Sequence, residues 1–207
     1  MLIRANELVP QGVFAEAQAE FLRPDIEVTT HLSALLEKHN VGVVAHFYMD
    51  PQLQGTLTGC DWPHIAISDS LVMADNAVRM AEAGVETIVV LGVDFMSENV
   101  RAMLDAAGKT DVPVYRVAAD PIGCSLAESA EALVYGAYLT KAAKTPSSLH
   151  VIYINTSLEV KARSHHLVPT ITCTSSNVVK TVLQASAQIE GLSIWFGPDT
   201  YMGHNLR

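Results

Sequence analysis

Two stretches of this sequence place polar side chains directly after runs of apolar residues. In "VGVVAHFYMDP" (41–51), an apolar run leads to His46 and Tyr48, and in "VIYIN" (151–155) another leads to Tyr153 and Asn155. Imidazole and phenol groups can donate and accept protons, as general acid–base catalysis requires. A single histidine at a strand end is more often a hydrogen-bonded structural residue than a functional one. The recurrence of polar strand ends favours a functional site.

Two hydroxyl-rich tripeptides open helical patterns. They are "SDS" (68–70), which contains Ser70, and "TSS" (174–176), which contains Ser175. Ordinary N-capping explains either one alone, because Ser, Thr and Asp cap helices frequently. The alternative is an anion site, in which hydroxyls and helix N–H groups bind phosphate or carboxylate. Both interpretations stay open.

The three cysteines differ in their surroundings. Cys124 lies in "DPIGCSL", a Pro/Gly loop that leads into a helix, where a thiolate is favoured. Cys60 and Cys173 have no polar partners nearby in sequence, and we interpret them as buried or incidental. An inert thiol is the alternative for Cys124. His165-His166 lies at a predicted helix end and indicates exposed surface rather than a metal site.

Apolar runs that alternate with helical patterns must position these side chains. Continuous Val/Ile-rich runs between helices are typical of parallel strands covered on both faces. In such α/β folds, ligands bind beyond the carboxyl ends of the strands. The predicted strands are 41–48, 64–68, 86–92, 112–117, 149–155, 170–173 and 192–197.

The landmarks of the first half recur in the second. His46 precedes Tyr153 by 107 residues, Ser68 precedes Thr174 by 106, and Gly92 precedes Gly197 by 105. This spacing predicts two copies of one αβα unit. The expected division is an N-terminal helical arm at 1–36, a first unit at 37–125 and a second unit at 126–207. The second unit is expected to be incomplete, because a loop matching that of Cys124 would fall beyond Arg207.

Composition excludes several classes of protein. The formal net charge of −9 argues against nucleic-acid binding, which needs a basic face. No apolar run is long enough to predict a membrane span. The odd cysteine count, without a CxxC pair, predicts neither a disulfide framework nor a self-contained zinc site.

Taken together and in order, several motifs resemble the quinolinate synthase family. They are "VVAHFYMDP", "ISDSLVMA", "LGVDFMSE", "GCSL", "YINTSLEVKA", "CTSSNVV" and "GPDTYMG". The resemblance covers roughly residues 37–207, and "AQAEFL" with "WPHIAISDSLVMADNAV" is most similar to the plastid enzymes of plants and algae. It implies an α/β fold with three similar αβα units in a pseudo-threefold ring, of which this chain holds two.

The resemblance also implies an activity. The family condenses iminoaspartate with dihydroxyacetone phosphate to form quinolinate, phosphate and water in NAD biosynthesis. It uses a [4Fe-4S] cluster held by one cysteine from each unit, with one iron left open for substrate. The implied upstream partner is L-aspartate oxidase, the implied compartment is the plastid, and a homodimer is one option for assembly.

Site residues follow from the same motifs. His46 and Tyr48 match the family's H-x-Y pair, and Tyr153 and Asn155 match its Y-x-N pair. Ser70 and Ser175 match serines of its S-D-S and T-S-x-N motifs, and Cys124 matches its first cluster ligand. The resemblance implies proton transfer at His46 and Tyr48 and a catalytic role for Tyr153. The residues that it implies in substrate binding are His46, Ser70, Tyr153, Asn155 and Ser175.

The departures from the family pattern leave two alternatives. The other two cluster cysteines have no counterpart before Arg207, so activity of these 207 residues alone is in question. One alternative is a non-catalytic anion-binding or phosphosugar-binding module. The other is a cluster-free enzyme that acts on a phosphorylated sugar with His46 as its base.

Overall fold

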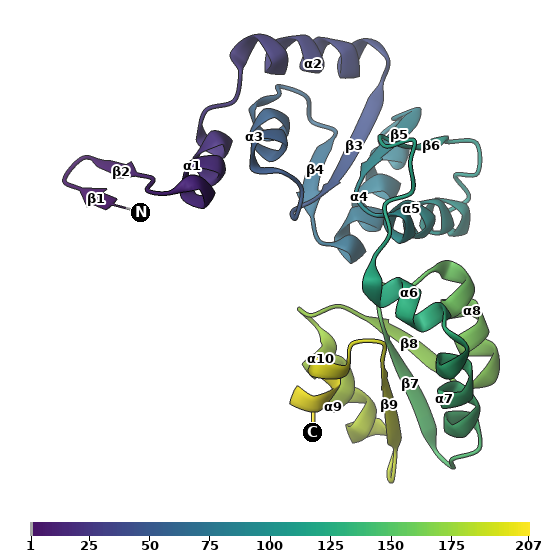
Figure 1. Cartoon of the computed structure of the whole chain (residues 1–207). Coiled ribbons are helices and arrows are strands. Elements are labelled where there is room, and N and C mark those ends of the chain that lie inside the picture. Colours follow the sequence, from purple (N-terminus) through teal and green to yellow (C-terminus); the bar gives the residue numbers. More distant parts are fainter. Residues whose placement is uncertain (1) are drawn as a thin grey trace. The chain divides into compact units, whose positions relative to one another are not determined.

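The computed structural model describes residues 2–207 and separates them into two compact units (Figure 1). The first unit extends to Gly92 and takes in Val100–Ala119, and the second consists of Val93–Asn99 and Asp120–Arg207. Each contains a parallel sheet flanked by helices. The α/β class predicted from the sequence is therefore confirmed.

The sheet of the first unit has four parallel strands in the order β4-β3-β5-β6. Strand β3 is rich in Val and Ala, and Val44 and Ala45 are fully buried on its two opposite faces. The strands are β3 (Val41–His46), β4 (Ile65–Ser68), β5 (Thr87–Leu91) and β6 (Val114–Arg116).

Aspartates begin three helices of the first unit. The carboxylates of Asp25, Asp50 and Asp69 accept hydrogen bonds from backbone N–H groups in the first turns that follow them. The helices are α1 (Val13–Ala19), η1 (Glu20–Leu22), α2 (Ile26–Lys38), α3 (Pro51–Gly59), α4 (Ser70–Glu82) and the later part of α5 (Asp94–Ala106). The start of α5, up to Asn99, belongs to the second unit.

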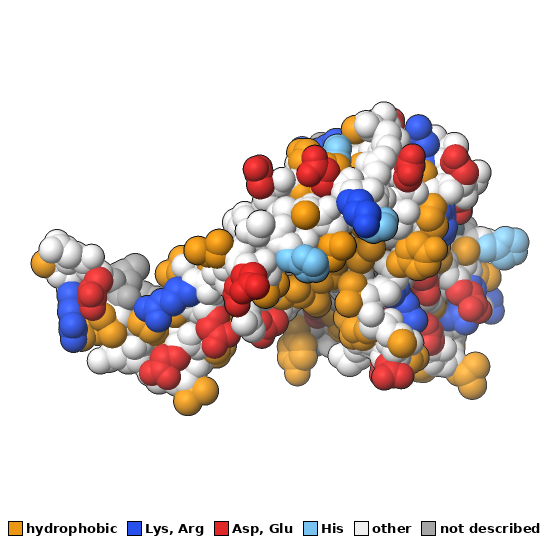
Figure 2. All heavy atoms as spheres, turned by 90° about the horizontal axis from the view of Figure 1, so that it is seen from above, with side chains coloured by type: hydrophobic (Ala, Val, Ile, Leu, Met, Phe, Trp, Pro, Cys, Tyr) orange, Lys and Arg blue, Asp and Glu red, His pale blue; other side chains and the backbone are white. Residues whose placement is uncertain are grey.

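Residues before α1 form a short antiparallel hairpin of β1 (Leu2–Arg4) and β2 (Glu7–Val9). An exposed ion pair, with 3.4 Å between Arg4 and Glu7, bridges its turn. The segment predicted as a helical arm thus holds this hairpin besides its helices. On the face drawn in Figure 2, acidic and basic side chains are interspersed.

The second unit has three parallel strands in the order β8-β7-β9. The first unit has the equivalent order β4-β3-β5, so the predicted duplication is present in the topology. The strands are β7 (Ser148–Tyr153), β8 (Thr170–Cys173) and β9 (Ser193–Gly197), and the helices are α6 (Ser125–Glu131), α7 (Leu133–Ala143), α8 (Leu158–Leu167), α9 (Val178–Gln188) and α10 (Thr200–Asn205).

Neighbouring residues of β7 face two different apolar clusters. Ile152 packs with residues of α6, α7 and α8, whereas Val151 packs with residues of α9, β9 and α10. This alternation is what a strand buried on both faces requires. The second unit therefore has three layers, with helices on both sides of its sheet (Figure 1).

A hydrogen-bonded polar pair lies inside this unit. His150 is fully buried, and its Nε2 lies 2.9 Å from the hydroxyl of Tyr135. Burial lowers the pKa of His150 to about 4, so the ring is neutral at physiological pH. Over residues 2–207, no helix combines the length and apolar character needed to cross a membrane.

Candidate functional site

The carboxyl end of the first sheet holds His46 and Tyr48. His46 is the last residue of β3 and pairs with Ser68 of β4. Its ring is buried, with 4% exposure, and its centroid lies 4.5 Å from that of Tyr48, which is 76% exposed. A buried imidazole beside an accessible phenol is therefore built where the sequence predicts a site.

A backbone hydrogen bond sets the tautomer of the neutral His46 ring. The N–H of Tyr48 donates to Nδ1 of His46 at 3.2 Å, so the neutral ring carries its proton on Nε2. Burial lowers the pKa of His46, and the charge of Asp69 opposes that shift. Near neutral pH, His46 is thus available as a neutral hydrogen-bond donor through Nε2.

The turn after β3 is fixed by a residue that sequence reasoning missed. The side-chain amide of Gln54 donates to the carbonyls of Phe47 (3.0 Å) and Met49 (2.7 Å). Asp50 caps α3, in which Pro51 is the first residue. The sequence "MDPQLQ" carries the signal for this cap, but a glutamine contact to the preceding turn has no comparable signature.

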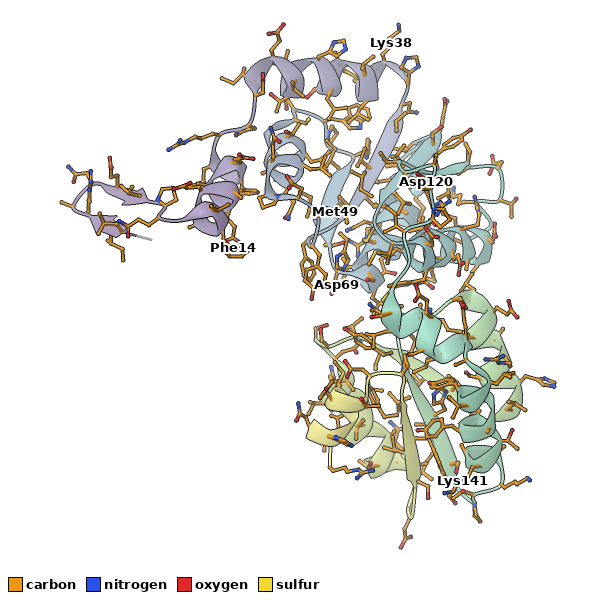
Figure 3. All side chains as sticks on the ribbon, viewed as in Figure 1. Phe14, Lys38, Met49, Asp69, Asp120 and Lys141 are labelled. Atoms are coloured by element: carbon orange, nitrogen blue, oxygen red, sulfur yellow. The ribbon has the colours of Figure 1, made fainter. Side chains whose placement is uncertain are left out.

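The "SDS" motif is a helix cap at the end of β4. Asp69 accepts from the N–H groups of Leu71 and Val72, both at 2.9 Å, and Ser70 is the buried first residue of α4. Figure 3 labels Asp69 at this turn after β4. Because the carboxylate already occupies two first-turn donors, Ser70 would have to bind an anion without them.

The carboxyl end of the second sheet holds Tyr153 and Asn155. Tyr153 is the last residue of β7 and pairs with Cys173, and both Tyr153 and Asn155 are half-buried. Ser175 is exposed after β8, beside a hydroxyl pair in which Thr174 and Ser176 lie 2.7 Å apart. The start of α9 has no side-chain cap, unlike that of α4. Its first-turn N–H groups thus have no side-chain acceptor like Asp69.

The second unit brings together two predicted site residues from different loops. Asn155 donates from Nδ2 to Sγ of Cys124 at 3.5 Å. Cys124 is half-buried and precedes α6 without making a side-chain capping bond. A Y-x-N residue and the candidate metal ligand are therefore neighbours.

The remaining cysteines do not complete a metal site. Cys173 is fully buried, and burial raises the pKa of its thiol to about 12. Cys60 directs its thiol to the carbonyls of Thr29 and Thr56. Within residues 2–207, no group of three His, Cys, Asp or Glu residues could hold a metal ion. Cys124 alone does not fit a complete cluster site.

Three further residues contact the segments that carry Cys124 and Asn155, and the sequence did not single them out for this role. Asp94 accepts from the N–H of Ile122 in the Cys124 loop, and Glu98 accepts from the N–H of Leu158. Lys161 donates from Nζ to the carbonyls of Ile154 and Thr156. Asp94 is the first residue of α5, so two of these three residues belong to the start of one helix.

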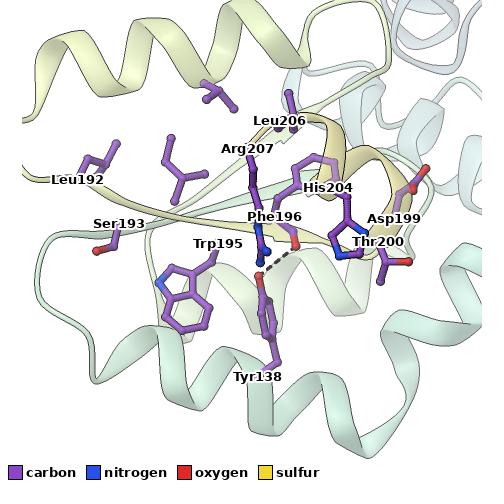
Figure 4. Close-up of a pocket in the computed structure, with 13 residues that line it drawn as sticks. Tyr138, Leu192, Ser193, Trp195, Phe196, Asp199, Thr200, His204, Leu206 and Arg207 are labelled. Atoms are coloured by element: carbon purple, nitrogen blue, oxygen red, sulfur yellow. Dashed lines mark hydrogen bonds between the residues drawn. The ribbon is translucent and has the colours of Figure 1, made fainter.

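The second unit also contains a pocket away from these residues. It has a volume of about 670 Å³ and lies between β9, α10 and Tyr138, whose hydroxyl donates to the Phe196 carbonyl at 3.0 Å (Figure 4). Its lining residues include none of the predicted site residues.

Comparison with known proteins identifies the family. Residues 30–207 match the model for the quinolinate synthetase A protein. The chain is 64% identical over 205 residues to quinolinate synthase, chloroplastic, of Oryza sativa subsp. japonica, and 58% identical over 208 residues to that of Arabidopsis thaliana. It is 34% identical over 177 residues to quinolinate synthase of Gloeothece citriformis.

The matches cover unequal shares of the two partners. They include 98% and 100% of this chain but 29% of each plant protein, and 86% of this chain but 46% of the cyanobacterial one. The chain thus spans less than a third of the length of its plant relatives. It belongs to the quinolinate synthetase A family.

Proposed function

We propose that this chain forms part of a quinolinate synthase, which condenses iminoaspartate with dihydroxyacetone phosphate to yield quinolinate, phosphate and water. The observation that carries the proposal is the family match across residues 30–207, which contain every candidate site residue. The names of the plant relatives support the same activity and a plastid location.

The carboxyl ends of the two sheets supply groups suited to this chemistry. His46 and Tyr48 would transfer protons, since a buried neutral imidazole lies beside an exposed phenol. Tyr153 would assist catalysis from the second unit. Ser70, Asn155 and Ser175, with His46 and Tyr153, would bind the substrate carboxylate and phosphate groups.

We further propose Cys124 as one thiolate ligand of a [4Fe-4S] cluster. A bound cluster with one open iron would supply a Lewis acid for substrate oxygens. The residues described here provide one suitable thiol, so the other ligands would have to come from outside these 207 residues.

The partners follow from the substrates. Iminoaspartate is an unstable product of amino-acid oxidation, so L-aspartate oxidase is the proposed supplier. A homodimer is the proposed assembly.

The proposal is tested with the full-length protein, reconstituted anaerobically with iron and sulfide and given L-aspartate oxidase, aspartate and dihydroxyacetone phosphate. Quinolinate, identified by mass spectrometry, is the expected product, and Cys124→Ser should abolish it. Cys60→Ser is the matched control and should leave it unchanged. A protein that binds dihydroxyacetone phosphate but forms no quinolinate would instead be the phosphosugar-binding module considered above.

A further inference from the structure

Lys161 is a charged residue of the second unit to which the proposed reaction gives no role. Its ammonium group is half-buried, 5.6 Å from the centroid of the buried Phe95 ring. Burial lowers the pKa of Lys161 to about 8, and Glu98 opposes that shift. The amine is therefore still largely protonated at neutral pH. Removing a charged group from water costs free energy of folding unless hydrogen bonds or opposite charges compensate for it.

The hydrogen bonds of Lys161 all go to one short loop. Nζ donates to the carbonyls of Ile154 (3.0 Å) and Thr156, the two residues that flank Asn155. Bonds from a charged donor are stronger than those between neutral groups. Lys161 thus holds the backbone on both sides of Asn155.

The same loop is tied down by its own residues. The N–H of Thr156 donates to the Ile154 carbonyl at 2.7 Å, and the Thr156 hydroxyl donates to the Tyr153 carbonyl at 3.1 Å. Thr156 is fully buried. With Lys161, the carbonyls of Tyr153, Ile154 and Thr156 all have hydrogen-bond partners, which restrains the backbone from which the Asn155 side chain extends.

The first turn of α5 completes the arrangement. Phe95 lies beneath the ammonium group, and Glu98 accepts from the N–H of Leu158 at 2.9 Å, at the start of the helix that carries Lys161. Asp94 and Ile122 exchange two hydrogen bonds, at 3.0 and 3.1 Å, which secure the loop before Cys124. One helical turn therefore contacts both loops that meet at the Asn155–Cys124 pair.

We propose that Lys161 is a positioning residue, which orients Asn155 against the Cys124 thiol by binding the carbonyls on either side of Asn155. The inference deepens the proposed function, on which its importance for catalysis rests. The placement itself involves only residues of this chain and can be measured without cluster or substrate.

The decisive measurement is the side-chain amide resonance of Asn155 in the 207-residue chain labelled with nitrogen-15 asparagine. In the unmodified chain, Cys124→Ala should shift this resonance, because the amide donates to Sγ. In a Lys161→Met background the same substitution should have no effect. Lys161→Arg keeps a charged donor and should restore most of the response.

Lys141→Met is the matched control. Lys141 is an exposed lysine in the last turn of α7, in the same unit (Figure 3), and its loss should leave the response of Asn155 intact. If Lys161→Met does not fold, Lys161→Gln replaces it, because glutamine keeps the stem and one donor and should weaken the response.

Amide hydrogen exchange separates local from general effects. Lys161→Met should raise exchange of residues 154–157 about tenfold and leave that of β9 unchanged, as expected of a local opening. A folded Lys161→Met chain in which Asn155 still responds to Cys124, or equal loosening of the loop and β9, would overturn the proposal. Absence of quinolinate in the full-length assay would overturn the proposed function and leave this result in place.

Discussion

At the scale of single residues, His46 and Tyr153 occupy corresponding positions at the ends of the central strands of the two units. Both residues lie at the carboxyl ends of their strands rather than in the middle of the sheet, so their loss should lower the turnover rate more than the stability of the fold. In the full-length enzyme we expect Tyr153→Phe and His46→Ala to lower kcat by about 10²–10⁴-fold. Steady-state kinetics with thermal unfolding checks this.

Tyr201→Phe provides the control for the tyrosine substitution. Tyr201 is 84% exposed in α10, outside the predicted site, and its variant should retain full activity. Near-normal kcat in both the Tyr153 and His46 variants would remove these residues from the catalytic assignment.

His150 should make the second unit sensitive to acid. Its folded pKa of about 4 lies below the ordinary histidine pKa of 6.5, so between these two pH values the unfolded chain binds the extra proton. Stability is therefore complete above pH 6.5 and is lost as pH falls toward 4, by about 3 kcal/mol at the limit.

The His150 prediction is checked by urea unfolding across this pH range. His150→Gln removes the titration and should flatten the pH profile, although it should also lower stability at pH 7.5 by disturbing the bond to Tyr135. The exposed His166→Gln should keep the wild-type profile. An unchanged slope in the His150 variant would rule out this histidine as the cause.

At the scale of elements, the sequence located strands better than helix faces. Each predicted apolar run overlaps a strand, because buried parallel strands need continuous apolar residues. The apolar spacing of α4 predicts one face made of Leu71, Ala74, Val78 and Ala81. Ala74 and Ala81 are buried, but Leu71 is exposed. Met73 and Ala77, which this spacing leaves off that face, are fully buried. Asp69 fixes where this helix begins, and the sheet then selects the face.

The contacts that join elements were beyond sequence reasoning. Asn155 meets Cys124 across 31 residues, and Glu98 meets Leu158 across 60. Local patterns predict neither, because such contacts depend on how loops from separate strands converge. The motif resemblance marked Asn155 and Cys124 individually, and only the structure shows them as a pair.

Two helical glycines should respond oppositely to the same substitution. A Cβ on Gly55 in α3 would lie 2.5 Å from the Phe21 carbonyl oxygen, whereas one on Gly136 in α7 would meet nothing within 4 Å. Gly136→Ala should stabilise the chain by about 0.5–1 kcal/mol through helix propensity. Gly55→Ala should destabilise it by about 1–3 kcal/mol, because the clash is with backbone.

Urea unfolding followed by circular dichroism measures both glycine variants. Stabilisation by Gly55→Ala would mean that α3 and η1 can separate without cost, contrary to their close packing.

At the scale of the whole molecule, strand register refines the predicted duplication. His46 pairs with Ser68, and Tyr153 pairs with Cys173, so Cys173 takes the place of Ser68 in the second unit. The sequence comparison had aligned Ser68 with Thr174, one residue further on. Cys173 is fully buried at this position and forms part of the apolar core of the second unit.

The final prediction concerns metal binding by the chain as a whole. Assembly of a [4Fe-4S] cluster requires several thiolates. Cys173 is fully buried, and Cys60 directs its thiol to backbone carbonyls. Cys124, which is half-buried and accepts a hydrogen bond from Asn155, is the one candidate ligand among the three cysteines. The isolated 207-residue chain should therefore hold no stable [4Fe-4S] cluster. Anaerobic reconstitution, desalting, and iron and sulfide analysis check this.

The full-length protein supplies the contrast. There, Cys124→Ser should abolish the broad visible absorbance of the cluster, since one iron loses its protein ligand. Cys60→Ser and Cys173→Ala should retain normal iron content, with a modest loss of stability for Cys173→Ala because that side chain is fully buried. About four irons per isolated chain after desalting, or a cluster that survives without Cys124 but not without Cys60 or Cys173, would contradict the ligand assignment.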